Sequence, residues 1–341
     1  MKVLCKRDQL REALTVVNGI IPVKSPRPAI ENVCLVATKD CLELVGTDLD
    51  VSVRVRLDEG KVEEPGTALV PARVASDFVR DLSTESIVLE TKDGVCTIQG
   101  ETDRCELVTI DPDEFPVVPR FSDDGAITLQ AGVFTKLVSR TAFAAARDQG
   151  RYAMHGILTL VEDELLRLVA TDGRRLAIAH APIETNGSPP QRAIVPAKGL
   201  QLLCRVMTDG LESVKFHFDK NQIGVKTRNA EVFARLIEGD FPRYAAVVPQ
   251  TSTNVIEADA ELLGRKLRLV ANVTAADTRA VKLGFSTNQM HITGRSAGTG
   301  EAQAEMEVQF PGDAAEIAFN PDYLIDGLKN CESDLVKLEF N

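Results

Sequence analysis

The chain has 341 residues, of which 44% are hydrophobic and 26% charged, and its net charge is −11. This length allows two or three domains, each with its own core, and the composition is typical of a soluble globular protein. No apolar run approaches the roughly 18 residues of a membrane span, and charge appears too early for a signal peptide, so we expect a cytoplasmic protein without membrane partners. The negative charge argues against nucleic-acid binding by the whole surface but permits a locally basic face.

Cysteine and histidine are scattered singly through the chain. The seven cysteines show no CxxC spacing, and the four histidines lack metal-ligand spacing. Most of the cysteines fall inside apolar patterns, which indicates reduced core residues. The sequence therefore predicts no metal site and no cofactor.

Three kinds of segment recur at nearly constant spacing. Leu44–Asp48 returns as Leu168–Asp172, 124 residues later. A Val-Pro-Ala segment at Val70 returns at Val195, and Phe319-Asn-Pro follows after a similar interval. A Phe-Pro closure occurs at residues 115–116 and 241–242. A repeat of this length predicts structural modules, which we place at residues 1–120, 125–249 and 252–341.

Each module has the pattern of one helix, several strands, a second helix and more strands. Apolar residues at helical spacing predict first helices at Arg7–Val17, Val133–Ala146 and Ala260–Ala271. Second helices are expected to begin at the three Val-Pro-Ala or Phe-Asn-Pro segments, where Asn320 can cap and Pro321 suits a first turn. Alternating strands complete an α+β module in which two helices pack on antiparallel sheet.

One hairpin and one chain end stand out within this pattern. Asp172-Gly173 lies between two runs rich in β-formers, which predicts a β-hairpin. Val336–Asn341 aligns with Val214–Asp219, after which the second module continues through two further strands. We therefore expect the third module to be incomplete at its C-terminus.

Basic residues gather on the helices of this acidic chain. A solvent-exposed face explains any single group, but recurrence in equivalent helices favours a surface that binds phosphates regardless of sequence and weakens with salt. Five of the six predicted helices carry such groups, namely Arg7 with Arg11, Arg73 with Arg80, Lys136 with Arg140 and Arg147, Lys198 with Arg205, and Arg265 with Arg268.

The sequence also suggests two alternative functional classes. An enzyme would use Asp172 or His155 as acid or base, but no nucleophile, second carboxylate or Gly-rich phosphate loop accompanies them, and Asp172 is better explained as a turn residue. We therefore predict no catalytic residue. The second alternative is a DNA-binding scaffold, in which the repeated modules bind DNA without closing into a ring.

The chain resembles the bacterial DNA sliding clamp, the beta subunit of DNA polymerase III. The resemblance rests on the three-module length, the string Ala170-Thr-Asp-Gly-Arg-Arg-Leu-Ala177, the two Phe-Pro closures, and Phe319-Asn320 with Tyr323. It implies a head-to-tail homodimer that closes six modules into a ring around duplex DNA, with helices inside and sheets outside. Such a ring is a processivity factor without chemistry of its own. It tethers the polymerase catalytic subunit, the clamp loader and other clamp-motif proteins.

The resemblance also implies three sets of site residues. The groove for partner peptides falls on Met154, Thr171, Gly173, Arg174, Arg175, Leu176, Pro242 and Val247. The DNA contacts fall on Lys24, Arg73, Arg80, Arg140, Arg147, Tyr152, Lys198 and Arg205. The dimer interface falls on Arg104, Cys105 and Leu107 of one subunit, and on Asn272, Val273, Glu301 and Glu305 of the other.

Overall fold

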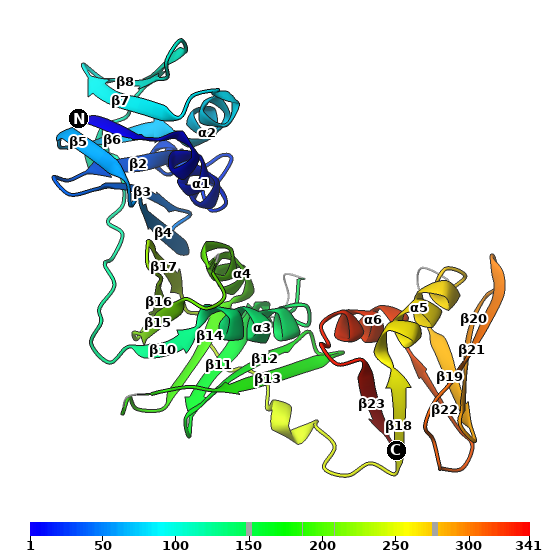
Figure 1. The fold of residues 1–341 in the computed structure, drawn as a ribbon. Coiled ribbons are helices and arrows are strands. Elements are labelled where there is room, and N and C mark those ends of the chain that lie inside the picture. The colour runs from blue at the N-terminus through cyan, green and yellow to red at the C-terminus, as the bar shows by residue number, and fades with distance from the viewer. Residues whose placement is uncertain (148–151, 186, 208, 275–278) are drawn as a thin grey trace. The chain divides into compact units, whose positions relative to one another are not determined.

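The computed structural model describes residues 1–147, 152–185, 187–207, 209–274 and 279–341. The chain forms two compact units (Figure 1). The first unit comprises residues 1–170 and 178–241, and the second comprises residues 171–177 and 242–341. The prediction of three modules with the boundaries given above stays a prediction, and the two units are described separately below.

The N-terminal half of the first unit contains two paired helices and nine strands. The Asn18 side-chain amide at the end of α1 donates to the Ala72 carbonyl at the start of α2, 3.3 Å away. A five-stranded antiparallel sheet has the order β5-β1-β7-β8-β9. The elements are β1 Lys2–Lys6, α1 Arg7–Asn18, η1 Pro28–Glu31, β2 Asn32–Ala37, β3 Leu42–Thr47, β4 Val51–Arg56, β5 Gly60–Glu64, β6 Gly66–Pro71, α2 Ala72–Asp81, β7 Ser86–Lys92, β8 Val95–Gln99, β9 Arg104–Val108 and η2 Pro112–Glu114.

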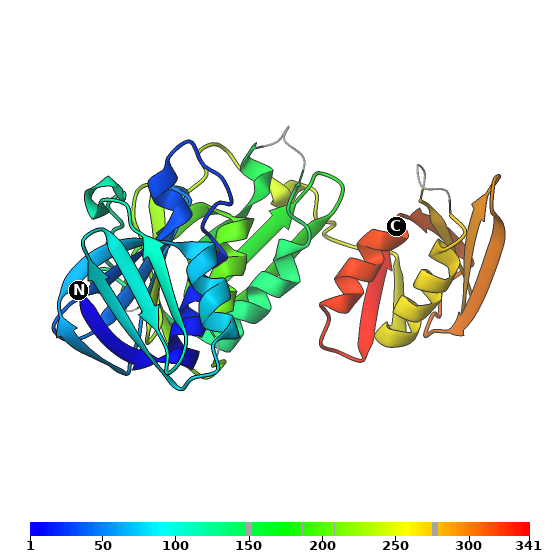
Figure 2. The same ribbon diagram turned by 90° about the horizontal axis from the view of Figure 1, so that it is seen from above.

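The other half of the first unit repeats this plan. Its helices α3 and α4 pack on each other, and a four-stranded sheet has the order β13-β12-β11-β14 (Figures 1 and 2). The elements are β10 Ile127–Gln130, α3 Ala131–Ala142, η3 Tyr152–His155, β11 Gly156–Glu162, β12 Leu165–Thr171, β13 Leu176–Pro182, β14 Gln191–Pro196, α4 Ala197–Val206, β15 Ser213–Phe218, β16 Gln222–Lys226 and β17 Ala230–Arg235.

The predicted boundaries of α3 were wrong at both ends. The helix begins at Ala131 directly after β10, because the Ala131 N–H bonds to the Glu212 carbonyl. It stops at Ala142, four residues before the predicted end. Tighter turns follow, in which Ala144 N–H bonds to Thr141 and Ala145 N–H to Ala142, and the Ala146 N–H bonds to the Met154 carbonyl instead. The predicted helix Ala260–Ala271 is confirmed as α5.

One eight-stranded sheet joins the two halves of the first unit. Its order is β10-β15-β16-β17-β4-β3-β2-β6, and the junction is the antiparallel pair β17–β4. In this pair Glu231 lies opposite Arg54, and Val232 lies opposite Val53. A continuous hydrogen-bonded ladder therefore fixes the register between the two halves.

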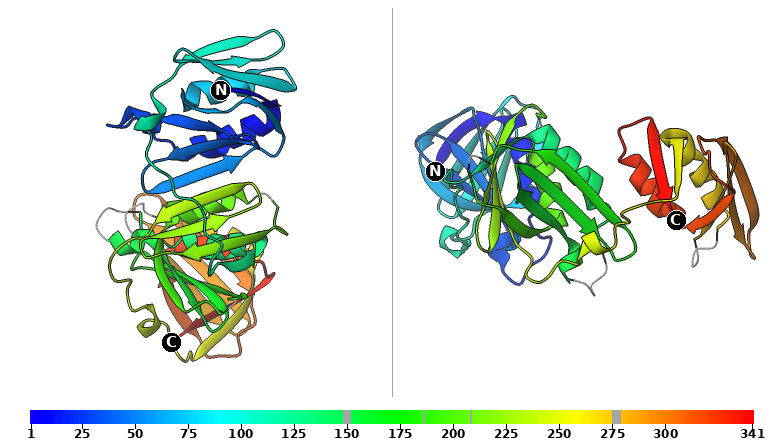
Figure 3. Two further views of the ribbon diagram at one scale, coloured as in Figure 1. Left: turned by 90° about the vertical axis from the view of Figure 1, so that its left-hand side faces the viewer. Right: turned by 90° about the horizontal axis from the view of Figure 1, so that it is seen from below.

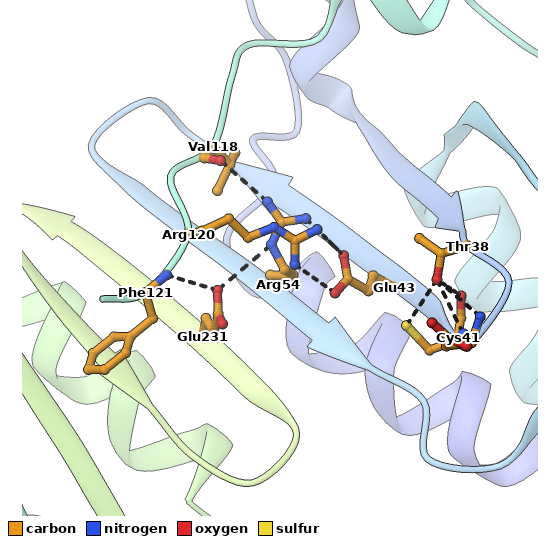
Figure 4. Close-up of polar contacts among 9 residues, drawn as sticks. Thr38, Cys41, Glu43, Arg54, Val118, Arg120, Phe121 and Glu231 are labelled. Atoms are coloured by element: carbon orange, nitrogen blue, oxygen red, sulfur yellow. Dashed lines mark hydrogen bonds and ion pairs between the residues drawn. The ribbon is translucent and has the colours of Figure 1, made fainter. Parts of the chain in front are cut away.

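An extended connection between η2 and β10 runs past this junction (Figure 3). Arg120 on the connection donates to both oxygens of Glu43, each at 2.8 Å, and Arg54 donates to Glu43 at 3.1 Å and to the Val118 carbonyl at 3.3 Å. Glu231 accepts the Phe121 N–H at 3.3 Å (Figure 4). Burial alone would raise the pKa of Glu43, but the hydrogen bonds and charges of Arg120 and Arg54 outweigh burial and lower it. These contacts, which we call the junction latch, hold the connection on the sheet.

The second unit is built around α5 and α6, which lie side by side in Figures 1 and 2. A four-stranded sheet of order β21-β20-β19-β22 packs on α5, and β18 pairs with β23. The predicted start of α6 is confirmed, since the Asn320 side chain accepts the Asp322 N–H at 2.9 Å and Pro321 is the first helical residue. The elements are η4 Tyr244–Ala246, β18 Asn254–Asp259, α5 Ala260–Ala271, β19 Val281–Ser286, β20 Gln289–Ser296, β21 Gly300–Glu307, β22 Ala315–Phe319, α6 Pro321–Lys329 and β23 Leu335–Phe340.

The predicted hairpin at Asp172-Gly173 joins β12 and β13, and its turn is built like the turn between β3 and β4. Asp172 Oδ1 accepts the N–H groups of Arg174 and Arg175 at 2.9 and 3.0 Å. Asp48 Oδ1 accepts those of Asp50 and Val51 at 3.1 and 2.8 Å. This finding supports the interpretation of Asp172 as a turn residue.

The residue after each aspartate differs between the two turns. Gly173 has φ 85° and Leu49 has φ 79°, so both occupy the left-handed region. Glycine adopts this conformation readily, whereas leucine is strained in it. The two turns therefore have the same backbone geometry, but only the turn that contains Gly173 adopts it without strain.

Two glycines occupy equivalent positions in the first and last repeats. A Cβ on Gly46 of β3 would lie 2.5 Å from Val17 Cγ1, and a Cβ on Gly294 of β20 would lie 2.7 Å from Val270 Cγ1. Only glycine lets the first helix pack this closely on the sheet. Since Gly46 lies opposite Val53 and Gly294 opposite Ala302, β21 corresponds to β4.

Candidate nucleic-acid and partner interfaces

The predicted DNA contacts on α4 lie beside the first half of the same unit. Lys198 Nζ is 2.6 Å from Asp48 Oδ2, and both α4 cations are exposed. Arg205 and Lys198 line a cavity of about 180 Å³ together with residues that include Gly19 at the end of α1. A second cavity of about 180 Å³ lies between α1 and Arg205. The structure thus gathers the two cations of α4 around the end of α1.

The two predicted contacts on α2 differ in their charge environment. Arg80 donates to Asp81 at 2.9 Å and to Asp77 at 2.7 Å. The hydrogen bond and charge of Asp81, followed by those of Asp77, raise the pKa of Arg80. Arg73 is exposed and forms no ion pair with the described residues. Arg73 is therefore the stronger phosphate-binding candidate of the two.

The other predicted DNA contacts lie in or near loops. Lys24 and Arg147 are exposed, and Arg140 is half-buried in the last turn of α3. Tyr152 begins η3, and its side chain lies outside the described part of the structure. Four of the eight predicted residues are thus exposed cations on α2 and α4, and three more are cations in or near the loops around α1 and α3.

Most of the predicted peptide groove belongs to the second unit. Arg175 is half-buried, with Nη1 2.8 Å from Asp326 Oδ2, Nε 3.1 Å from Asp172 Oδ2, and its guanidinium 4.9 Å from the centre of the Tyr323 ring. The hairpin tip is therefore attached to α6.

The remaining groove residues vary in exposure. Gly173, Arg174 and Val247 are exposed, Leu176 and Pro242 are half-buried, and Thr171 is buried. Met154 is half-buried in η3 and belongs to the first unit.

Five of the seven predicted dimer residues lie on two strands that each form the edge of a sheet. Arg104, Cys105 and Leu107 lie on β9, and Glu301 and Glu305 lie on β21. Asn272 and Val273 follow the last turn of α5. Cys105 and Val273 are half-buried, while Arg104, Asn272, Glu301 and Glu305 are exposed. An unpaired strand edge is a template for pairing with another chain.

Sequence comparison decides the family. Models of the N-terminal, central and C-terminal domains of the DNA polymerase III beta subunit match residues 1–119, 128–243 and 245–341. The beta sliding clamp of Escherichia coli is 30% identical over 339 residues, which cover 99% of this chain and 92% of the relative. The chain belongs to the DNA polymerase III beta subunit family.

Further relatives agree with this membership. The beta sliding clamp of Pseudomonas putida is 30% identical, over 98% of this chain and 91% of its own length. A crystal structure of the DNA polymerase III subunit beta from Pseudomonas aeruginosa superposes with a TM-score of 0.94, at 28% identity, covering 100% of this chain and 93% of that one. A sliding clamp from the same organism bound to griselimycin gives a TM-score of 0.95, at 28% identity and the same coverage.

Membership confirms the resemblance, the α+β clamp fold and the function of a DNA polymerase processivity clamp. Among the described residues, no helix is long and apolar enough to cross a membrane. In the same part of the chain, no group of three or more His, Cys, Asp or Glu side chains could hold a metal ion.

Sequence reasoning missed the carboxylates that hold the predicted cations. Asp48 pairs with Lys198, and Asp326 pairs with Arg175, at separations of 150 and 151 residues. The recurrence of Leu44–Asp48 as Leu168–Asp172 indicated a structural role for Asp48, but no sequence pattern near Asp48 identifies Lys198 as its partner.

Proposed function

We propose that two copies of this chain close head to tail into a ring of six modules that encircles duplex DNA. The ring tethers the polymerase catalytic subunit, the clamp loader and other clamp-motif proteins through short peptides, and it works in the cytoplasm without catalysing a reaction. The modules are residues 1–120, 125–249 and 252–341. The observation that carries the proposal is the match of this chain along its length to a clamp family, with the basic helix faces repeated in an acidic chain.

The junction inside the first unit offers a template for dimer contact. β9 occupies the position in the first repeat that β17 occupies in the second. Cys105 of β9 lies opposite Ile98, and Val232 of β17 lies opposite Val225. Both pairs come just after a turn that is closed by one backbone hydrogen bond. Since β21 corresponds to β4, the pairing of β17 with β4 predicts the register in which β9 of one subunit pairs with β21 of the other. Cys105 then lies opposite the partner's Ala302. Arg104 lies opposite the partner's Gln303, diagonal to the carboxylates of Glu301 and Glu305.

Binding to DNA is assigned to the cations Lys24, Arg73, Arg80, Arg140, Arg147, Lys198 and Arg205, with Tyr152. Long side chains that bind phosphates without reading bases give attraction without a preferred register. A closed ring needs no tight contact to stay on DNA, because it is held topologically. Weak, repeated contacts therefore suit a clamp that moves along the duplex.

Partner peptides are assigned to the groove of Met154, Leu176, Pro242 and Val247, with the polar rim of Thr171, Gly173, Arg174 and Arg175. Apolar walls bind a leucine or aromatic anchor, and the rim orients the peptide backbone. The griselimycin complex of the similar Pseudomonas aeruginosa clamp supports a ligand site in this family.

A primer-extension assay with the cognate polymerase and clamp loader tests the function. Wild-type protein is expected to lengthen the product made in one polymerase binding event. A variant with Met154→Ala and Leu176→Ala is expected to lose this effect while remaining a dimer by light scattering. Product lengths unchanged by the wild-type protein would contradict the proposal, and full activity of the double variant would contradict the groove assignment.

A further inference from the structure

In the two repeated turns, Oδ1 of the aspartate has the same hydrogen-bonding role, whereas Oδ2 binds a different cation in each turn. In each turn Oδ1 accepts two backbone N–H groups, which completes the turn. The second oxygen then binds a cation. Asp172 Oδ2 takes Arg175 from its own turn, whereas Asp48 Oδ2 takes Lys198, which is 150 residues away in sequence. The Asp48–Lys198 contact is therefore an addition to the turn and is not needed to form it.

Lys198 occupies an unusual place for a cation. It is the second residue of α4, and the first turn of α4 contains no acidic residue and no capping side chain. A helix N-terminus carries partial positive charge, so a lysine there is disfavoured unless an anion is near. Asp48 supplies that anion from the preceding repeat. The Asp48 side chain is 16% exposed and that of Lys198 is 66% exposed, so the carboxylate is protected while the ammonium stays accessible.

The cavity beside Lys198 has no carboxylate among the described residues that line it. Those residues are Gly19, Ile20, Val51, Lys198, Gln201, Leu202 and Arg205. A phosphate entering the cavity would meet two cations and an amide, and it would compete with Asp48 for the Lys198 ammonium. Asp48 is thus placed to weaken one phosphate contact without blocking it.

We propose that Asp48 is a positioning residue that holds Lys198 partly neutralised and so limits the strength of this DNA contact. The inference rests on the proposed DNA-binding function. Removing the Asp48 charge frees the full charge of Lys198 for a phosphate, which adds about one released counterion per complex. A clamp with this attenuated contact meets a lower barrier when it moves from one phosphate to the next.

The test measures the binding of a fluorescein-labelled linear duplex of about 20 base pairs by anisotropy, over roughly 50 to 200 mM salt. Asp48→Asn keeps an oxygen that can accept the two turn N–H bonds, so the fold is expected to persist. We expect Asp48→Asn to bind about threefold to tenfold more tightly at the lowest salt, with a slope of log K against log salt steeper by about 0.9. Adding Lys198→Ala to Asp48→Asn is expected to remove this gain.

Asp50→Asn is the matched control, because Asp50 is exposed in the same turn and forms no ion pair with the described residues. Equal affinities of Asp48→Asn and Asp50→Asn, with ordinary salt-dependent binding by the wild type, would contradict this inference alone. A gain that survives Lys198→Ala would contradict it as well. Absence of salt-dependent binding in the wild type and in Asp48→Asn would contradict both this inference and the proposed function.

Discussion

Both oxygens of the Glu43 carboxylate accept hydrogen bonds from the Arg120 guanidinium, each at 2.8 Å. Glu43 lies on β3, and Arg120 lies on the connection that leads to β10. The Glu43 side chain is 9% exposed, and Arg54, which also binds it, is 10% exposed. One buried carboxylate therefore binds two guanidinium groups where the two halves of the first unit meet, and Glu231, 4.0 Å from Arg54, supplies the second negative charge.

Replacing Glu43 is expected to destabilise the first unit strongly. Glu43→Gln removes the nearer of the two carboxylates beside buried Arg54 and leaves only Glu231, at 4.0 Å, which should cost about 3 kcal/mol of unfolding free energy. Urea denaturation followed by circular dichroism measures this change. The control is Glu63→Gln, which breaks the exposed pair with Lys2 and should cost less than about 1 kcal/mol. Equal small losses in both variants would show that the junction latch does not stabilise the fold.

The same carboxylate predicts how stability depends on pH. The pKa of folded Glu43 is lower than its ordinary value of 4.5, because Arg120 and Arg54 outweigh burial. Its contribution is therefore complete above pH 4.5 and declines as pH falls below that value toward the folded pKa. The free-energy difference between wild type and Glu43→Gln should shrink over this acidic range. A difference that stays constant or grows on acidification would have the wrong sign.

Leu49 and Gly173 predict opposite responses in the two matching turns. Leu49→Asn should raise the unfolding free energy by about 0.5 to 1 kcal/mol, because asparagine tolerates positive φ better than leucine. Gly173→Ala should lower it by about 1 kcal/mol for the same reason. Thermal denaturation of both variants tests this pair. A destabilised Leu49→Asn would mean that burial of Leu49, which is 40% exposed, outweighs backbone strain.

Cysteine labelling tests the proposed dimer edge. Burial raises the pKa of Cys5 to about 12 and that of Cys204 to about 11, so these thiols should react slowly at neutral pH. Cys331 is exposed and serves as an internal reference. Labelling of Cys105, read by mass spectrometry, should slow as protein concentration rises, while Cys331 should not change.

Arg104→Glu is the matched variant for this experiment, since it would remove the cation that pairs with Glu106 and add a carboxylate near the partner's Glu301 and Glu305. Cys105 in this variant should stay reactive at every concentration. Labelling of Cys105 that is independent of concentration in the wild type would contradict the β9–β21 interface.

Much of the fold could be predicted because it depends on local patterns. The α5 boundaries and the Asn320 cap follow from helical periodicity and capping chemistry, and Asp172-Gly173 marks a turn directly. The end of α3 could not be predicted, because a distant carbonyl, that of Met154, takes the Ala146 N–H. The exposed position of Cys331 differs from the general prediction that the cysteines are core residues, and its polar neighbours Asn330 and Glu332 agree with that exposure.

The candidate site was predictable only in part. Its cations are visible in sequence as repeated helix positions, whereas their counter-charges lie far away along the chain. Asp48 reaches Lys198, and Glu43 reaches Arg120, only after the repeats have folded against one another. Charge pairing of this kind depends on tertiary placement, which no local pattern encodes.

Retention on DNA of different topology tests the central claim most directly. Clamp loaded onto nicked circular DNA should elute with the DNA during gel filtration at a salt concentration that removes electrostatically bound protein. Linearising the DNA should release it, because a ring can slide off a free end. Equal retention on circular and linear DNA would contradict a sliding ring.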